Sequence, residues 1–127
     1  MAPQSDRLAQ RLGAIFGLFA AILGAMAAHG AVHNFLAREG HHLESWHTAN
    51  AYQWFHAVAL LAIGQNRPVH RATVICWLIG VLLFSGSIYL LALDPELTWA
   101  GPITPIGGLF LMAGWMWLWV TLLKKSS

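Results

Sequence analysis

The sequence has 127 residues, of which 57% are hydrophobic and only 12 carry a formal charge, 7 Lys or Arg and 5 Asp or Glu. Soluble domains carry charge on roughly a quarter of their residues, so this composition excludes a soluble monomer of this size, and its hydrophobicity excludes disorder. The basic residues are scattered in pairs with no cluster interleaved by aromatic residues, which excludes a nucleic-acid-binding protein.

Four apolar stretches follow one another along the chain, each close to the roughly 20 residues that a helix needs to cross a bilayer. They predict an all-α protein with a single integral membrane domain over residues 1–127 and transmembrane helices at 12–29, 46–64, 72–93 and 102–123. The short connections at 66–71 and 94–97 make adjacent helices antiparallel neighbours, as in an up-down four-helix bundle.

The first stretch is rich in glycine and alanine and is preceded by Arg7 and Arg11. This pattern is typical of a signal peptide cleaved near Ala27, but also of a retained membrane helix. We favour retention because small residues allow helices to pack closely in membranes. The small residues that motivate this interpretation are Gly13, Gly17, Ala20, Ala21, Gly24 and Ala28.

The charges between the stretches predict the orientation. Six of the seven basic residues fall at one end of the predicted bundle: Arg7, Arg11, Arg67, Arg71, Lys124 and Lys125. Four of the five acidic residues fall at the other end: Glu39, Glu44, Asp94 and Glu96. Because Lys and Arg are enriched on the cytoplasmic side of membrane proteins, we expect both termini in the cytoplasm.

Polar residues concentrate in the second stretch, where His56 lies about 15 Å along the helix from Trp46, near the bilayer midplane. Ionisable groups are rare at this depth and suggest a site. The predicted polar intramembrane site comprises Tyr52, Gln53, His56, Ser85, Ser87 and Thr104. These residues are interpreted either as ordinary interhelical hydrogen bonds, which we favour, or as a proton- or solute-handling site centred on His56.

Two prolines interrupt the start of the fourth stretch. Pro102 and Pro105 have no N–H to donate to the carbonyls of Thr98 and Gly101. We therefore expect either a helix that starts late, near Pro105, or a non-helical segment at 103–105 that is buried against the other helices.

Histidines gather near the predicted outer end. His29 and His33 are four residues apart, a spacing that lets two imidazoles on one helix bind one metal ion. No HExxH or cysteine motif accompanies them, and we favour the alternative that these interfacial histidines are simply hydrated. A bis-histidine haem is not expected because His56 lies much deeper than this pair, so we expect no cofactor.

A Ser–His dyad of His56 with Ser85 or Ser87 would suit a hydrolase, but neither serine lies in a GxSxG motif and no carboxylate is near to orient the imidazole. We therefore expect no enzyme.

Four motifs carry a family resemblance: GAMAAHGA at 24–31, WHTANAYQWFHAVAL at 46–60, LFSGSIYLLAL at 83–93 and GPITPIGGLFLMAGW at 101–115. In this order they resemble the YgdD/YwdK-type family of small inner-membrane proteins, domain-of-unknown-function family 423. The resemblance implies a four-helix protein of the bacterial inner membrane with an uncleaved first helix. It implies no activity.

We expect the protein to be an accessory or scaffold subunit of a membrane complex, or a homo-oligomer, with the lipid bilayer around it. Trp115, Trp117 and Trp119 motivate this hypothesis, because residues two apart cannot share a narrow helix face and some of these rings must meet lipid or another subunit. The alternative is a small-solute or proton-linked transporter that uses the polar site at His56.

Overall fold

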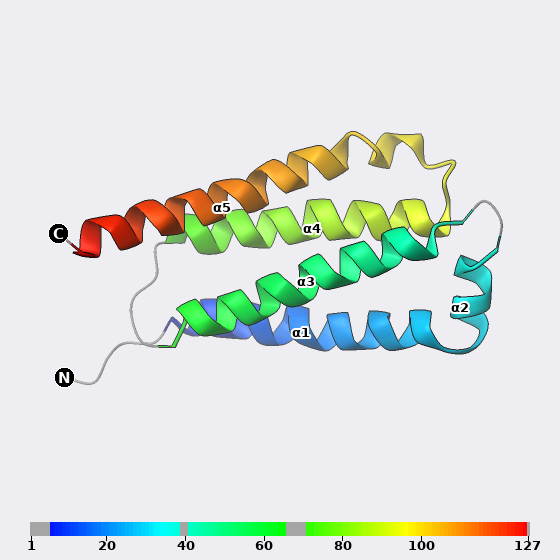
Figure 1. Ribbon diagram of the computed structural model, residues 1–127, viewed down its shortest axis with the longest axis horizontal. Coiled ribbons are helices and arrows are strands. Elements are labelled where there is room, and N and C mark those ends of the chain that lie inside the picture. Colours follow the sequence, from blue (N-terminus) through cyan, green and yellow to red (C-terminus); the bar gives the residue numbers. More distant parts are fainter. Residues whose placement is uncertain (1–5, 39–40, 66–70, 127) are drawn as a thin grey trace.

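The structure, a computed structural model, describes residues 6–38, 41–65 and 71–126. It contains four long helices, α1 (Arg7–Ala28), α3 (Leu43–Ile63), α4 (Arg71–Leu93) and α5 (Ile103–Ser126). A short helix α2 (Gly30–Leu36) and a 3-10 turn η1 (Thr98–Ala100) connect them at one end (Figure 1). No strand occurs in these ranges, and the all-α prediction is confirmed.

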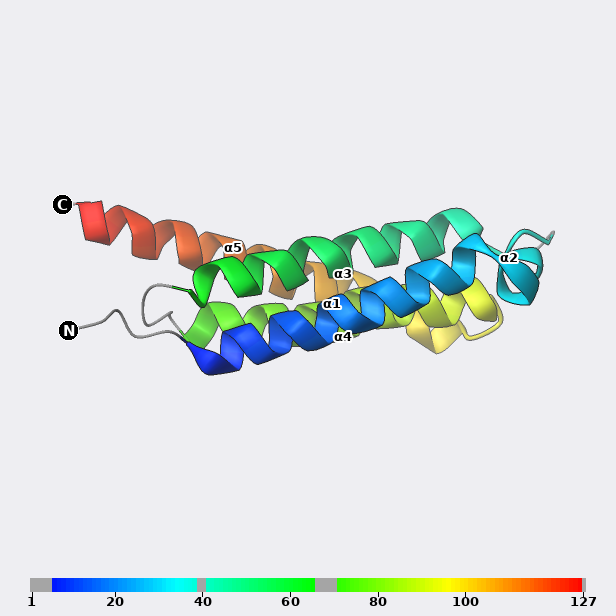
Figure 2. The ribbon, with the colours of Figure 1, turned by 90° about the horizontal axis from the view of Figure 1, so that it is seen from below.

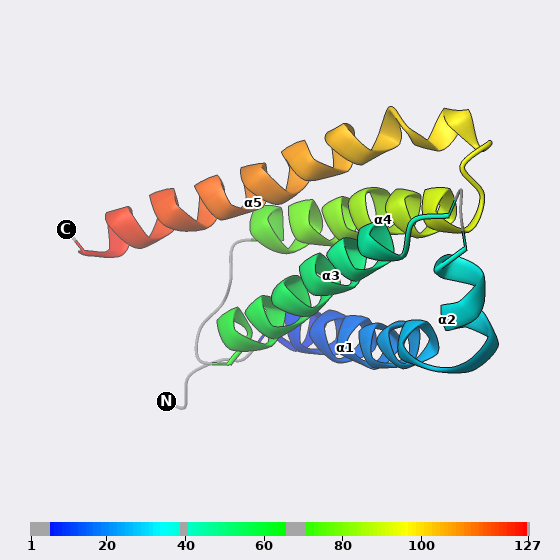
Figure 3. The same cartoon turned by 45° about the vertical axis from the view of Figure 1, so that its right-hand side comes forward.

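The long helices alternate in direction, so the start of α1 and the end of α5 lie at the same end of the bundle, opposite α2 and η1 (Figures 1 and 2). α3 packs between α1 and α4, and α5 packs mainly on α4 (Figure 3). The end with the start of α1 and the end of α5 carries Arg7, Arg11, Arg71 and Lys124. Arg67, Glu39 and the side chain of Lys125, which also belong to the predicted charge pattern, lie outside the described part of the chain.

Glycines allow the closest helix contacts. A Cβ atom at Gly13 of α1 would lie 2.7 Å from the carbonyl oxygen of Ala57 on α3. A Cβ at Gly107 of α5 would collide with the backbone of Phe84 on α4. Because membrane helices gain stability from close packing, these glycines favour the pairing of α1 with α3 and of α4 with α5.

The start of α5 corrects both expectations about its prolines. Residues 103–105 are helical, and the helix begins at Ile103 rather than at Pro105. The Gly101 N–H donates to Thr98 O over 3.2 Å and the Thr104 N–H donates to Gly101 O over 3.3 Å, so both carbonyls have local partners. Pro105 lies in the first turn of the helix. Backbone N–H groups in the first turn have no acceptor within the helix, so proline is tolerated there.

The C-terminal end of α1 also differs from the expected range. The helix ends at Ala28, His29 is extended, and Gly30 has a φ of 73°. Glycine enters this left-handed region without steric cost, which lets the chain turn sharply into α2. The N-terminus of α1 is capped by Asp6, whose Oδ1 accepts from the Ala9 N–H over 3.1 Å.

Within the described ranges, three helical segments are long and apolar enough to cross a membrane: Arg7–Ala28, Arg71–Leu93 and Thr98–Lys124. α3 has a similar length but more polar residues, including Glu44, His47, Asn50 and Gln53. Large apolar side chains are exposed on all four long helices, which is the surface expected of a membrane protein.

Candidate functional site

A row of side-chain donors on α3 faces α1. Positions 46, 50 and 53 of α3 share one helix face because they are separated by four and three residues. The side chain at each position donates a hydrogen bond to a backbone carbonyl oxygen within α1: Trp46 to Leu23 (2.9 Å), Asn50 to Ala20 (2.8 Å) and Gln53 to Phe16 (2.9 Å). The row therefore holds the two antiparallel helices in one register.

Two side chains of α4 are hydrogen-bonded to α3. The Tyr89 hydroxyl donates to Gln53 Oε1 over 2.7 Å and accepts from Asn50 Nδ2 over 3.3 Å. The Ser85 hydroxyl donates to the carbonyl oxygen of Ala49 over 2.8 Å. Gln53 thus links three helices, α1, α3 and α4, through its two amide atoms.

His56 lies in a separate aromatic cluster. Its Nδ1–H donates to the Tyr52 carbonyl oxygen over 2.7 Å, and its Nε2 accepts from Trp115 Nε1–H of α5 over 3.0 Å. The Trp77 ring of α4 stands edge-on to it, with the centroids 5.5 Å apart. Because an indole N–H only donates, this arrangement requires a neutral imidazole protonated at Nδ1. The imidazole is 3% exposed and connects α3 to α5.

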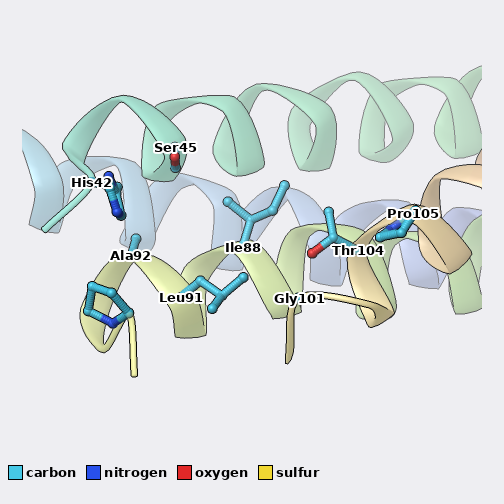
Figure 4. A pocket seen from close by; sticks show the side chains of 9 residues that line it. His42, Ser45, Ile88, Leu91, Ala92, Gly101, Thr104 and Pro105 are labelled. Carbon is cyan, nitrogen blue, oxygen red and sulfur yellow. The ribbon is translucent and has the colours of Figure 1, made fainter. Parts of the chain in front are cut away.

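The hydroxyls of Ser87 and Thr104 contact each other between α4 and α5. Ser87 Oγ also donates to Phe84 O over 3.1 Å, so the Thr104 hydroxyl is the donor to Ser87. Thr104 lines a pocket of about 480 Å³ at the end of the bundle that holds α2 and η1, together with Ser45 of α3 and His42, which precedes that helix (Figure 4). Most of the other lining residues are apolar, so the pocket is polar mainly on its α3 side.

The six residues of the predicted polar site therefore fall into three groups. Gln53 and Ser85 both connect α3 to α4, through Tyr89 and through Ala49 O respectively. His56 lies in the aromatic cluster, and Ser87 pairs with Thr104. The Tyr52 side chain is exposed and packs on Phe84, with ring centroids 4.8 Å apart, so Tyr52 contributes only its carbonyl oxygen.

Sequence reasoning missed two members of these networks. Asn50 lies one turn before Gln53, and this spacing could have placed it on the same face. Trp115 as the partner of His56 had no comparable signal, because their contact depends on how α5 rotates against α3.

The structure separates the predicted metal ligands His29 and His33. They do not lie one turn apart on a continuous helix, because the break at His29 and Gly30 ends α1 before α2 begins. His33 Nδ1–H donates to the carbonyl oxygen of Ala27 over 2.7 Å. Among the described residues, no three His, Cys, Asp or Glu side chains are grouped so as to hold a metal ion.

Comparison with known proteins identifies the family. The family described as "Protein of unknown function (DUF423)" matches residues 23–108, and the chain belongs to this family, as its motifs predict. UPF0382 membrane proteins are similar to it over most of their length. That of Haemophilus influenzae is 40% identical, covering 91% of this chain and 94% of the relative. YwdK of Bacillus subtilis is 34% identical (89% and 94%), and C1782.12c of Schizosaccharomyces pombe is 39% identical (82% and 92%). No solved structure matches the chain.

Proposed function

We propose that this member of the DUF423 family is a multi-pass protein of the bacterial inner membrane, with α3 as a fourth transmembrane helix and both termini in the cytoplasm. The polar side chains in the middle of α3 are hydrogen-bonded to neighbouring helices, whereas Trp54, Phe55 and Val58 on its exposed surface are apolar. A helix of this kind is compatible with the membrane because its polar groups are satisfied inside the bundle.

Basic residues gather at the end of the bundle where α1 starts and α5 ends, and they support the cytoplasmic orientation of the termini. Arg7 and Arg11 are in the first turns of α1, Arg71 begins α4, and Lys124 lies near the end of α5. Basic residues at that end favour its retention in the cytoplasm. The opposite end carries Glu44, Asp94 and Glu96 among its described residues.

Within the membrane, the protein acts as a non-enzymatic accessory or scaffold subunit. The hydroxyl of Ser85 is bonded to a backbone carbonyl and that of Ser87 to Phe84 O and Thr104, while both nitrogens of His56 have other partners. This arrangement argues against the Ser–His dyad. The polar groups that a catalyst would need are instead used to hold the helices together.

The observation that carries the assembly role is a stripe on α5, named here the α5 stripe: Leu109, Met112, Met116 and Trp119. Each of these side chains is more than half exposed, and their spacing of three, four and three residues is that of a helix seam packed by knobs into holes. α5 packs mainly on α4, so this stripe is available to a helix of a second copy or of another membrane protein.

Cross-linking in native membranes tests this assembly. Cys76 is the only cysteine, so Cys76→Ser provides a background for Met112→Cys and Met116→Cys. A bifunctional maleimide should join these variants into a dimer, or into an adduct of one other defined mass if the partner is a different protein. Leu18→Cys, exposed on α1, is the control and should give neither. A monomer at every α5 stripe position would contradict the assembly role.

The transporter alternative has less support. A proton carrier needs a titratable atom that can reach water, but His56 is buried and both of its ring nitrogens are hydrogen-bonded. A pH-dependent flux in liposomes that His56→Ala abolished, while the purified variant remained folded, would favour transport over the scaffold role.

A further inference from the structure

A groove of about 260 Å³ lies between α1 and α4, which both pack on α3. Ile15 and Phe19 of α1 and Leu82 of α4 line it, and each of these side chains is about half exposed. The groove therefore opens sideways onto the apolar surface of the bundle. In a bilayer this opening faces the hydrocarbon chains and not the water at either end of the helices.

The groove also has polar lining residues, Gln53 and Ser85. Gln53 is 5% exposed, and its Nε2 carries two hydrogens but makes one hydrogen bond within the described part of the chain, to Phe16 O. Ser85 uses its hydrogen to bond Ala49 O, so its oxygen can still accept. The groove thus offers one buried donor and one acceptor to a molecule that enters it.

Gly86 leaves part of the groove wall without a side chain. A Cβ atom added at this position would meet no atom within 4 Å apart from its chain neighbours and its own helix backbone, whereas Gly80, six residues earlier on the same helix, is in tight contact with Leu111. Helix packing therefore does not require glycine at position 86. The missing side chain leaves space beside the polar residues.

We propose that this groove binds a membrane-dissolved apolar molecule that carries one hydroxyl group, an alcohol or a phenol. The hydroxyl oxygen accepts from the second Gln53 N–H, and its hydrogen is donated to Ser85 Oγ. The apolar body lies against Ile15, Phe19 and Leu82 and continues into the lipid through the side opening. An acyl chain without a hydroxyl would leave the Gln53 N–H unpaired, which is unfavourable in an apolar environment.

The size of the groove agrees with this class of ligand. Its volume is below the roughly 300–1,000 Å³ of sites that enclose a drug-sized molecule. It suits a single ring or a short chain segment, with the rest of the molecule left in the bilayer. The inference requires only that α1 and α4 lie in a membrane, and it is independent of any assembly through α5.

Photolabelling of the full chain in phosphatidylcholine nanodiscs tests the groove. The probe is a long-chain alkylphenol with a diazirine on the chain beside the ring, and the matched probe has hydrogen in place of the hydroxyl. We expect saturable labelling within residues 15–19 and 81–89, located by mass spectrometry. The phenol should label roughly three- to tenfold more strongly than the matched probe, since this ratio corresponds to one net hydrogen bond.

Gly86→Leu fills the groove and should reduce phenol labelling to the level of the matched probe. Ala113→Leu places the same side chain on the exposed surface of α5 and should leave labelling unchanged. Circular dichroism and monodisperse elution establish that both variants are folded. Equal labelling by the two probes, labelling spread evenly over the exposed helices, or unchanged labelling of folded Gly86→Leu would each overturn the proposal.

Discussion

Trp115 of α5 donates a hydrogen bond to His56 of α3, with 3.0 Å between the indole Nε1 and the imidazole Nε2. Because the Nδ1–H is directed at the Tyr52 carbonyl oxygen, both ring nitrogens have partners inside the protein. α5 packs mainly on α4, so this bond is a specific connection between α5 and the helix at the centre of the bundle. His56 therefore orders the packing of three helices, together with Trp77.

Removing the indole donor should weaken this connection. Trp115→Phe keeps an aromatic ring but leaves His56 Nε2 without its partner, and we expect a loss of about 0.6 kcal/mol, or up to about 1.7 kcal/mol, as for other interhelical bonds in membranes. Reversible unfolding in mixed micelles measures the change. Trp99→Phe, at an exposed position in η1 and outside the α5 stripe, is the control and should change stability little. Equal losses in both variants would show that the bond contributes nothing.

The tautomer of His56 is a second consequence of the same geometry. The indole cannot accept a hydrogen bond, so the imidazole must be neutral and carry its proton on Nδ1. Nitrogen-15 NMR of the selectively labelled protein should show a protonated Nδ1 and an unprotonated Nε2 for His56. Trp115→Phe removes the constraint and is the natural comparison. A spectrum with Nε2 protonated in the unaltered protein would contradict the geometry.

Substitutions of Gln53 and of its partner Tyr89 should lower the stability of the protein by different amounts. Gln53→Leu leaves the half-buried Tyr89 hydroxyl without its acceptor and the Phe16 carbonyl without its side-chain donor, and we expect a loss of about 1–3 kcal/mol. Tyr89→Phe removes only one hydroxyl and should cost about 0.6 kcal/mol. In the double variant the losses should not add, because the two residues share one bond. Additive losses would argue against that bond.

Two adjacent glycines provide a matched test of helix packing. A methyl group at Gly107 would collide with the Phe84 backbone, whereas at Gly108 it would lie 3.7 Å from the Phe84 ring, an ordinary contact. We expect Gly107→Ala to lose about 1–3 kcal/mol through overpacking. Gly108→Ala should be neutral or slightly stabilising, because alanine has the higher helix propensity. Thermal unfolding of the two variants checks this difference, and equal midpoints would contradict the contact.

The sequence predicted correctly those features that depend on the periodicity of a single helix. The apolar stretches predict the long helices, and the depth of His56 and Gln53 in the second stretch predicts that they need partners inside the protein. The spacing of Trp46, Asn50 and Gln53 also contains the row of donors that faces α1. These features depend only on one helix and the environment around it.

The identity of the partners required the structure. Whether His56 meets Ser85 or Trp115 depends on the rotation of α4 and α5, which is set by glycine contacts such as that of Gly107 with Phe84. The alternative of a metal site shared by His29 and His33 assumed a continuous helix, but the backbone turns at Gly30. The spacing of the two histidines does not reveal this turn. Only Gly30, which can adopt the left-handed conformation, indicates it in the sequence.

The most direct test of the account concerns α3, because four spans place the chain ends on the same side and three spans place them on opposite sides. In the Cys76→Ser background, Gln65→Cys and Glu96→Cys report on the two ends of α4, where both residues are exposed. With α3 in the membrane and the N-terminus inside, a membrane-impermeant maleimide should label Glu96→Cys in intact cells and Gln65→Cys only after lysis. Labelling of Gln65→Cys but not Glu96→Cys in intact cells would mean that α3 does not cross or that the orientation is inverted, and either result would contradict four spans with both termini in the cytoplasm.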